Sequence, residues 1–206
     1  MLFPTTGILD NFNRADENPL SDGGNWSGPI FPGDQRHQVL TNLAAGAGAF
    51  PESYRSNTTY GPDAECFFTI QTLPATGEYV SPWVRMQTPN TTGLDGYTVT
   101  WTKLAGVDSL QLFRIDNTVG TQLGATVSLE MGAGDRLGIE AIGSVISVYV
   151  NQGSGWVQQI SATDATYGAA GNIGMDSSET TYRIDDFGGG TAAAVTPQRT
   201  LIGVGR

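Results

Sequence analysis

Three residue types that often build reactive sites are almost missing from this chain. Its 206 residues include one cysteine (Cys66), one histidine (His37) and one lysine (Lys103). A single cysteine excludes a disulfide within the chain. One cysteine and one histidine also exclude the Cys/His clusters that hold zinc, and any Ser-His-Asp triad that does not use His37. We expect His37 to be a hydrogen-bonded histidine on an edge strand, and Cys66 to be a small buried residue.

Charge is scarce as well, and most of it is negative. Charged residues make up 15% of the chain, the net charge is −10 and nine of the ten basic residues are arginine. No basic stripe occurs, so we expect neither a nucleic acid nor an anionic membrane surface as a partner. The first ten residues, MLFPTTGILD, have no basic region and no long apolar run. They predict no signal peptide, and no segment predicts a membrane span.

The sequence shows almost no helical periodicity. Apolar and polar residues alternate instead, and some of the 28 glycines interrupt this alternation. In YTVTWTKL (97–104), for example, Tyr97, Val99 and Trp101 fall on one face of a strand and threonines on the other. Repeated short strands with one apolar face predict two packed antiparallel sheets. The predicted strands are 9–14, 37–43, 52–57, 64–72, 79–88, 95–104, 108–116, 121–129, 135–142, 144–150, 155–161, 171–176 and 181–188.

The two ends of this predicted sandwich carry matching short signatures. LDNFNR (9–14) and YRIDDFGGG (182–190) each contain Asp, a spacer and Phe, which are Asp10 and Phe12 in one and Asp185 and Phe187 in the other. Residues i and i+2 of a strand share a face, so each stretch would place a carboxylate and a ring together.

These signatures belong to an ordered series that resembles the concanavalin A-like (LamG-like) modules common in structural proteins of tailed phages and prophages. The series is DNFNRAD, GNW at 24–26, DGYTV at 95–99, GDRLGIEAIG at 134–143, GNIGM at 171–175 and IDDFGGG. The resemblance implies an all-β jelly roll of two antiparallel sheets. In this fold the first and last strands lie side by side in one sheet, which would explain their matching signatures. We expect an N-terminal arm (1–8), the jelly-roll sandwich (9–188) and a C-terminal docking arm (189–206).

Enzymes of this fold family use carboxylates at alternate positions of one strand, because hydrolysis of a glycosidic bond needs an acid and a nucleophile on either side of it. Only Asp63 and Glu65 have such spacing, at the entrance of a strand, and Glu140 is alone on its face. We therefore expect a protein without catalytic residues. A glycoside hydrolase or polysaccharide lyase stays open if residues from distant strands assemble the site.

Glycan binding stays open too, because of EYVSPWVRMQ (78–87). Its alternate residues differ in character: Val80, Val84 and Met86 have one parity, and Tyr79, Trp83 and Arg85 the other. If the valines face the core, Trp83 and Arg85 face outward beside the threonine face of 95–104. An exposed ring beside hydroxyls can bind a sugar. The alternatives are a protein–protein contact or a partly covered tryptophan.

The resemblance also implies a structural calcium ion near the chain ends, where Asp10 and Asp185 are the candidate ligands. The alternative is that these carboxylates pair with Arg14 and Arg183 or accept hydrogen bonds from turn amides. We expect no other cofactor.

The last segment, GGGTAAAVTPQRTLIGVGR (188–206), suggests how the protein could join an assembly. The three glycines are expected to end the last strand, and the apolar stretch beyond them could add a strand to a partner's sheet. The predicted contacts are Arg199, Leu201, Ile202 and Val204. The main expectation is therefore a homo-oligomeric capsid decoration subunit of a virion, assembled with other virion proteins in a bacterial cytoplasm. A lectin-like module that binds a surface glycan is the alternative.

Overall fold

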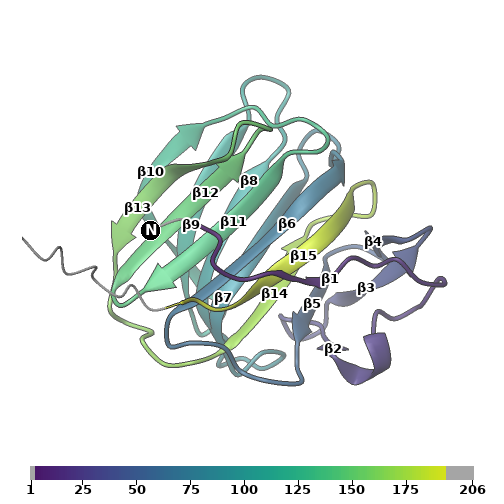
Figure 1. Cartoon of the computed structure of the whole chain (residues 1–206), viewed down its shortest axis with the longest axis horizontal. Helices are drawn as coiled ribbons and strands as arrows, with labels where there is room; N and C mark the ends of the chain where they lie inside the picture. Colours follow the sequence, from purple (N-terminus) through teal and green to yellow (C-terminus); the bar gives the residue numbers. More distant parts are fainter. Residues whose placement is uncertain (1–2, 194–206) are drawn as a thin grey trace, which may run out of the picture.

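The computed structural model describes residues 3–193, which form two β-sheets packed face to face (Figure 1). Sheet A is antiparallel, and β1 (Ile8–Asp10) joins it by pairing with β15. Its other strands run in the order β3 (Gln35–Leu40), β4 (Leu43–Gly46), β15 (Arg183–Thr191), β6 (Ala64–Thr72), β11 (Arg136–Ile142), β12 (Val145–Asn151) and β13 (Trp156–Thr163).

Sheet B is the second layer, and β3 connects it to sheet A by pairing in parallel with β5 and antiparallel with β4. A short strand, β2 (Trp26–Ser27), lies on β5 and follows a 3-10 turn, η1 (Asp22–Gly24). The main strands run in the order β10 (Val119–Ser128), β9 (Ser109–Asp116), β8 (Asp95–Thr102), β7 (Tyr79–Gln87), β14 (Asn172–Ser177) and β5 (Pro51–Arg55).

The core lies between the sheets and contains the residues that the alternation predicted. Tyr97, Val99 and Trp101 of β8 are fully buried, and so is Cys66 of β6. Burial of each large side chain contributes roughly 1.5–3 kcal/mol, so this layer supplies most of the stability. The prediction of an all-β sandwich is confirmed.

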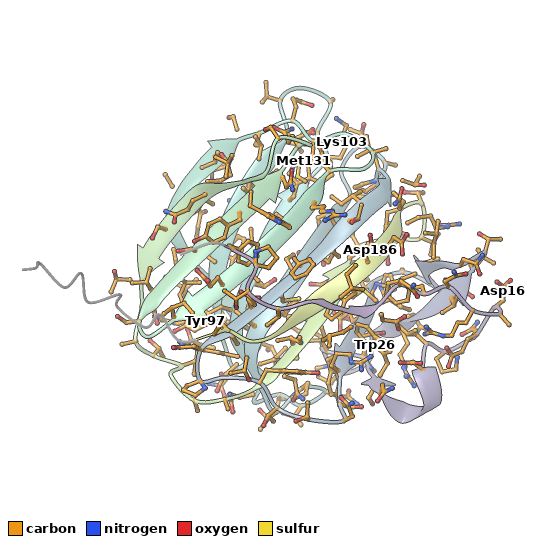
Figure 2. The ribbon with its side chains drawn as sticks, viewed as in Figure 1. Asp16, Trp26, Tyr97, Lys103, Met131 and Asp186 are labelled. Carbon is orange, nitrogen blue, oxygen red and sulfur yellow. The ribbon has the colours of Figure 1, made fainter. Side chains whose placement is uncertain are left out.

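The first and last strands are neighbours, as the resemblance to concanavalin A-like modules implied. β1 pairs antiparallel with β15, with Asp10 opposite Phe187. Phe12 and Phe187 are both buried, and the ring of Trp26 lies 4.7 Å from that of Phe187. Figure 2 shows Trp26 on the side of the molecule where β1 meets β15. The repeated Phe is therefore explained by one shared core.

The expected common face of Asp185 and Phe187 is wrong. Asp186, labelled beside β15 in Figure 2, has φ 49°, and the pairing of β15 with β6 shifts register there. This bulge adds one residue to the strand, so Ile184 and Phe187 both enter the core while Asp185 lies on the other side.

His37 is not on an edge strand. A turn at Thr41 and Asn42, both with positive φ, divides the predicted strand 37–43 into β3 and β4. His37 thus lies between β4 and β5, fully buried, with its ring Nδ1 3.2 Å from Ser53 Oγ. This burial lowers the pKa of His37 to about 3, so the ring is neutral at physiological pH.

The three glycines do not end the last strand, because β15 continues through them to Thr191. They allow close packing instead, since a Cβ on Gly188 would overlap the ring of Phe67. The segment before β1 crosses the outer face of sheet A (Figure 1). There Phe3 stacks on Tyr149 at 4.3 Å and Glu65 accepts hydrogen bonds from both Thr5 and Thr6.

The tail residues Arg199, Leu201, Ile202 and Val204 lie outside the described residues, so their role in assembly stays a prediction. Over residues 3–193 the structure has no helix with the length and apolarity that a membrane crossing requires.

Candidate functional site

A groove of about 330 Å³ lies on the face of sheet B that points away from sheet A. Aromatic rings and uncharged polar groups dominate it, and Asp176 is the single charged residue among those that line it. The lining residues are Phe31, Tyr79, Trp83, Thr98, Thr100, Gln111, Phe113, Ile115, Thr118, Gly120 and Asp176.

The groove floor is built from two rows of side chains that cross the strands. The first, which we call the polar row, runs over β5, β14, β7, β8 and β9. Strand register places Asp176 between Glu52 and Ser81, and places Thr100 opposite Gln111. Ser81 donates a hydrogen bond of 3.1 Å to Thr100, which joins the two halves. Residues opposite each other in neighbouring strands share a face, so the row is continuous.

The second row, the ring row, lies beside it. Trp83 is opposite Thr98, and Thr98 is opposite Phe113. Gly174 separates Trp83 from Tyr54 of β5 and has no room for a Cβ, which would lie 2.6 Å from the carbonyl oxygen of Ser53. Trp83 is 1% exposed, so it forms the base of the groove.

The walls of the groove are three half-buried rings: Phe31, Tyr79 and Phe113. Phe31 comes from the loop before β3, and its ring packs edge-on against Trp83 at 5.7 Å. A half-buried ring keeps one surface for a ligand, while its buried part holds it in place. Rings beside hydroxyl and amide groups are suited to sugars, which have apolar faces and polar edges.

Two of the three predicted sugar-binding residues lie at this groove. Tyr79 and Trp83 do so, next to Thr98 and Thr100, as the alternation of 95–104 predicted. The expected exposure of the Trp83 ring is wrong, because Phe31 packs against it and leaves it 1% exposed. Arg85 lies elsewhere. It has φ 51° within a register shift between β7 and β8, and this bulge reverses the alternation. Met86 therefore joins the side of Trp83, while Arg85 is buried and donates to carbonyl oxygens at one end of the sandwich.

A pair of buried carboxyl groups lies at one end of the groove. Asp176 is 5% exposed and Glu52 is 2% exposed. Asp176 Oδ2 lies 3.4 Å from Trp83 Nε1, and its Oδ1 has no hydrogen-bond partner. Glu52 Oε2 accepts hydrogen bonds from the backbone N–H groups of Ile30 and Phe31. Burial, with Asp34 nearby, raises the pKa of both carboxyl groups above their usual range.

Sequence reasoning missed this pair because its members come from β5 and β14, which are far apart along the chain. Phe113 and Gln111 were missed for the same reason, because the sequence did not show which strands lie next to theirs. No spacing within one segment could reveal them. The one sign in the sequence was Asp176 itself, a carboxylate in the strand segment NIGMDS, which contains no basic residue to pair with it.

The raised pKa of Asp176 predicts that this residue lowers stability at neutral pH. The folded state holds a proton that the unfolded chain loses above about pH 4, so stability falls as pH rises toward the folded-state pKa. We expect thermal unfolding temperatures to fall between about pH 4 and about pH 7, and Asp176→Asn to reduce that fall. Asp164→Asn is the control, since hydrogen bonds from Tyr97, Thr166 and Arg114 lower the pKa of Asp164 to about 2 despite its partial burial. An unchanged slope in Asp176→Asn would contradict the prediction.

The calcium candidates Asp10 and Asp185 lie near enough for the charge of Asp10 to contribute to the raised pKa of Asp185, but each accepts hydrogen bonds from other groups. Asp10 is fully engaged: Oδ1 accepts from Phe12 N and from Arg14 at 2.7 Å, and Oδ2 accepts from Trp26 Nε1. The alternative pairing with Arg14 is therefore confirmed. Asp185 Oδ1 accepts from the Asp186 N–H. Within residues 3–193 no three His, Cys, Asp or Glu side chains form a group that could hold a metal ion. Structural calcium stays a prediction.

No protein-family model matches this chain. No curated protein matches it either. Solved structures do. The carbohydrate-binding module CBM66 from Bacillus subtilis has a TM-score of 0.61 at 14% identity, over 84% of this chain and 99% of the module. The exoplasmic/lumenal domain of VIP36, bound to Ca²⁺ and Man2, has a TM-score of 0.67 at 9% identity, over 94% of this chain and 90% of that domain. The β-glucanase of Bacillus licheniformis has a TM-score of 0.57 at 14% identity, over 86% and 97%.

These similarities cover nearly the whole described sandwich, and they show its fold. It is a concanavalin A-like jelly roll, as the sequence resemblance implied. They give no support to a phage context, which stays a prediction.

Proposed function

We propose that this protein binds a glycan, without cleaving it, in the groove on sheet B. The observation that carries the proposal is the pair of parallel rows on the groove floor. The ring row and its walls supply apolar surfaces for sugar rings, and the polar row supplies hydrogen bonds along their edges. Structural neighbours named as carbohydrate-binding modules or sugar-bound domains support the same function.

Binding without hydrolysis is proposed because the groove holds one carboxylate. A glycosidase needs two, one on each side of the bond. Glu52 is next to Asp176 in register, but one of its oxygens accepts two backbone N–H groups, and Glu52 is not among the residues that line the groove. A hydrolase was kept as an alternative in case distant strands brought two carboxylates together. That pair exists, with only one member accessible to a ligand.

The first test is removal of a groove wall. Phe113→Ala is expected to weaken binding of a glycan selected on an array by tenfold or more, since aromatic anchors dominate such interfaces. The measurement is titration calorimetry on the intact protein. Trp156→Ala is the matched control, because Trp156 is also half-buried but packs against Phe3 and Phe67 on the outer face of sheet A.

Equal affinity in wild type and Phe113→Ala, or an equal loss in Trp156→Ala, would contradict the proposed groove. Release of new reducing ends from the same glycan, abolished by Asp176→Asn, would contradict binding without cleavage. The capsid decoration role depends on the tail and not on this groove. Particle binding by chains with and without 194–206, a truncation that leaves β15 (Arg183–Thr191) whole, tests that role separately.

A further inference from the structure

Asp176 has a buried side-chain oxygen that no other group of the described structure satisfies. It is 5% exposed and lines the groove, yet Oδ1 has no hydrogen-bond partner. A buried polar atom without a partner costs about 1–3 kcal/mol of stability, and native structures keep few of them. An oxygen with free lone pairs at the wall of a ligand groove is placed to accept a hydrogen bond from what binds there.

The surroundings of Asp176 determine the charge of a suitable ligand. The groove lining contains no Lys, Arg or His. Glu52 is its register neighbour on β5, and Asp34 lies near enough to raise the pKa of Asp176. Tyr79 and Trp83 of β7 are its uncharged neighbours. An anionic sugar would add like charge beside buried carboxyl groups, with no cation in the lining to compensate.

The polar row continues from Asp176 with uncharged groups. Ser81 and Thr100 supply hydroxyls, and Gln111 supplies an amide. These groups donate and accept hydrogen bonds as sugar hydroxyls do. They match a chain of hydroxyls. An ammonium group would give up its hydration and meet only one opposite charge among the lining residues, that of Asp176.

We propose that Asp176 determines the specificity of the groove: its Oδ1 accepts a hydrogen bond from a sugar hydroxyl, and its charge excludes acidic sugars, so the ligand is an uncharged glycan. The inference rests on the proposed function and adds the chemical class of the ligand. Asp176 has no role in bond breaking here.

The test uses β-1,4-linked sugars in matched pairs that differ only at C6: β-1,4-mannan with polymannuronate, and soluble cello-oligosaccharides with their polyglucuronate counterpart. Chitosan oligomers supply the amine-bearing probe. Binding of the full-length protein is measured at about pH 8.5, above the raised pKa of Asp176, so that its carboxylate is charged, and at fixed ionic strength. We expect wild type to bind at least one uncharged polymer about tenfold or more tighter than its acidic counterpart, and tighter than chitosan.

Two variants separate charge from hydrogen bonding. Asp176→Asn keeps an Oδ1 acceptor but loses the charge. It should bind the uncharged polymer with an affinity within about threefold of wild type. The ratio of its affinities for the uncharged and the acidic polymer should be smaller than in wild type. Asp176→Ala loses the acceptor and should weaken binding of the uncharged polymer by about tenfold. Thermal unfolding of each variant establishes that it is folded.

The outcomes distinguish the two proposals. If Phe113→Ala abolishes binding while Asp176→Asn leaves the preference unchanged, the groove is a glycan site and Asp176 does not set its specificity. Tighter binding of chitosan or of an acidic polymer by wild type would also overturn the assignment of ligand class. If wild type binds no member of the panel, both proposals fail.

Discussion

Replacement of Arg85 by alanine is expected to lower the free energy of unfolding by about 4 kcal/mol, since it removes a buried charged donor from several acceptors at once. The guanidinium donates to the carbonyl oxygens of Pro62, Ala141, Gly143 and Tyr167 at 2.6–3.2 Å. Arg85 thereby holds together the start of β6, the β11–β12 turn and the loop before β14.

Alanine would leave these carbonyl oxygens without a donor and open a cavity where the side chain now lies. Chemical denaturation with wild type as reference measures the loss. Arg136→Ala is the control, since Arg136 has a 42% exposed side chain whose ion pair with Asp186 is long at 3.7 Å. Its expected loss is below about 0.5 kcal/mol. Similar losses in the two variants would show that the hydrogen bonds of Arg85 are not what stabilises this end of the sandwich.

The second large effect is expected at Gly189, where alanine should destabilise the fold by about 4 kcal/mol. Gly189 has φ +143°, and a Cβ there would lie 2.9 Å from Cys66 Cα and closer still to the carbonyl oxygen of Glu65. Both atoms belong to the backbone of β6, so relief requires the two strands to separate. Backbone strain and overlap therefore add.

Gly190→Ala separates the two causes. Gly190 has nearly the same φ, +148°, but the nearest atom to its Cβ is the side-chain Cγ2 of Thr6 at 3.3 Å. Its expected loss is only the backbone strain of about 1–3 kcal/mol. Denaturant titration of both variants gives the comparison. A Gly190→Ala loss as large as that of Gly189→Ala would assign the whole effect to the backbone conformation.

The alternation of apolar and polar residues was enough to predict the sandwich and most of its strands. The expected strand 64–72 coincides with β6, because a half-buried strand imposes a period of two on its sequence. That regularity makes strands visible without homologues. The neighbouring position of the chain ends was implied by the family resemblance, and β1 does pair with β15.

The same rule explains where prediction failed. Arg85 and Asp186 adopt positive φ without being glycine, and each adds a bulge that reverses the alternation after it. No residue type near either position marks the bulge in the sequence, because a bulge depends on how the strand pairs with its neighbour. Tyr79 and Trp83 precede the Arg85 bulge and were placed correctly.

The carboxyl pair could not be predicted for a different reason. Glu52 and Asp176 meet only because β14 lies between β5 and β7, and strand order in a sheet is set by the whole chain. In the sequence, neither carboxylate differs from an ordinary polar residue of a strand. The glycan hypothesis therefore survives with a different set of residues, in which Phe113 and Asp176 replace Arg85.

The pairing of β1 with β15 has a consequence for the order of folding. During synthesis, Asp10 leaves the ribosome long before Phe187, its partner in the sheet, has been added. At about 5–20 residues per second, β1 waits roughly ten seconds or more for its neighbour. Until then Trp26 lacks the ring of Phe187 beside it, and the edge of the nascent sheet stays open. Sheet A closes only after β15 has been synthesised, which makes its completion a late event dominated by contacts between distant residues.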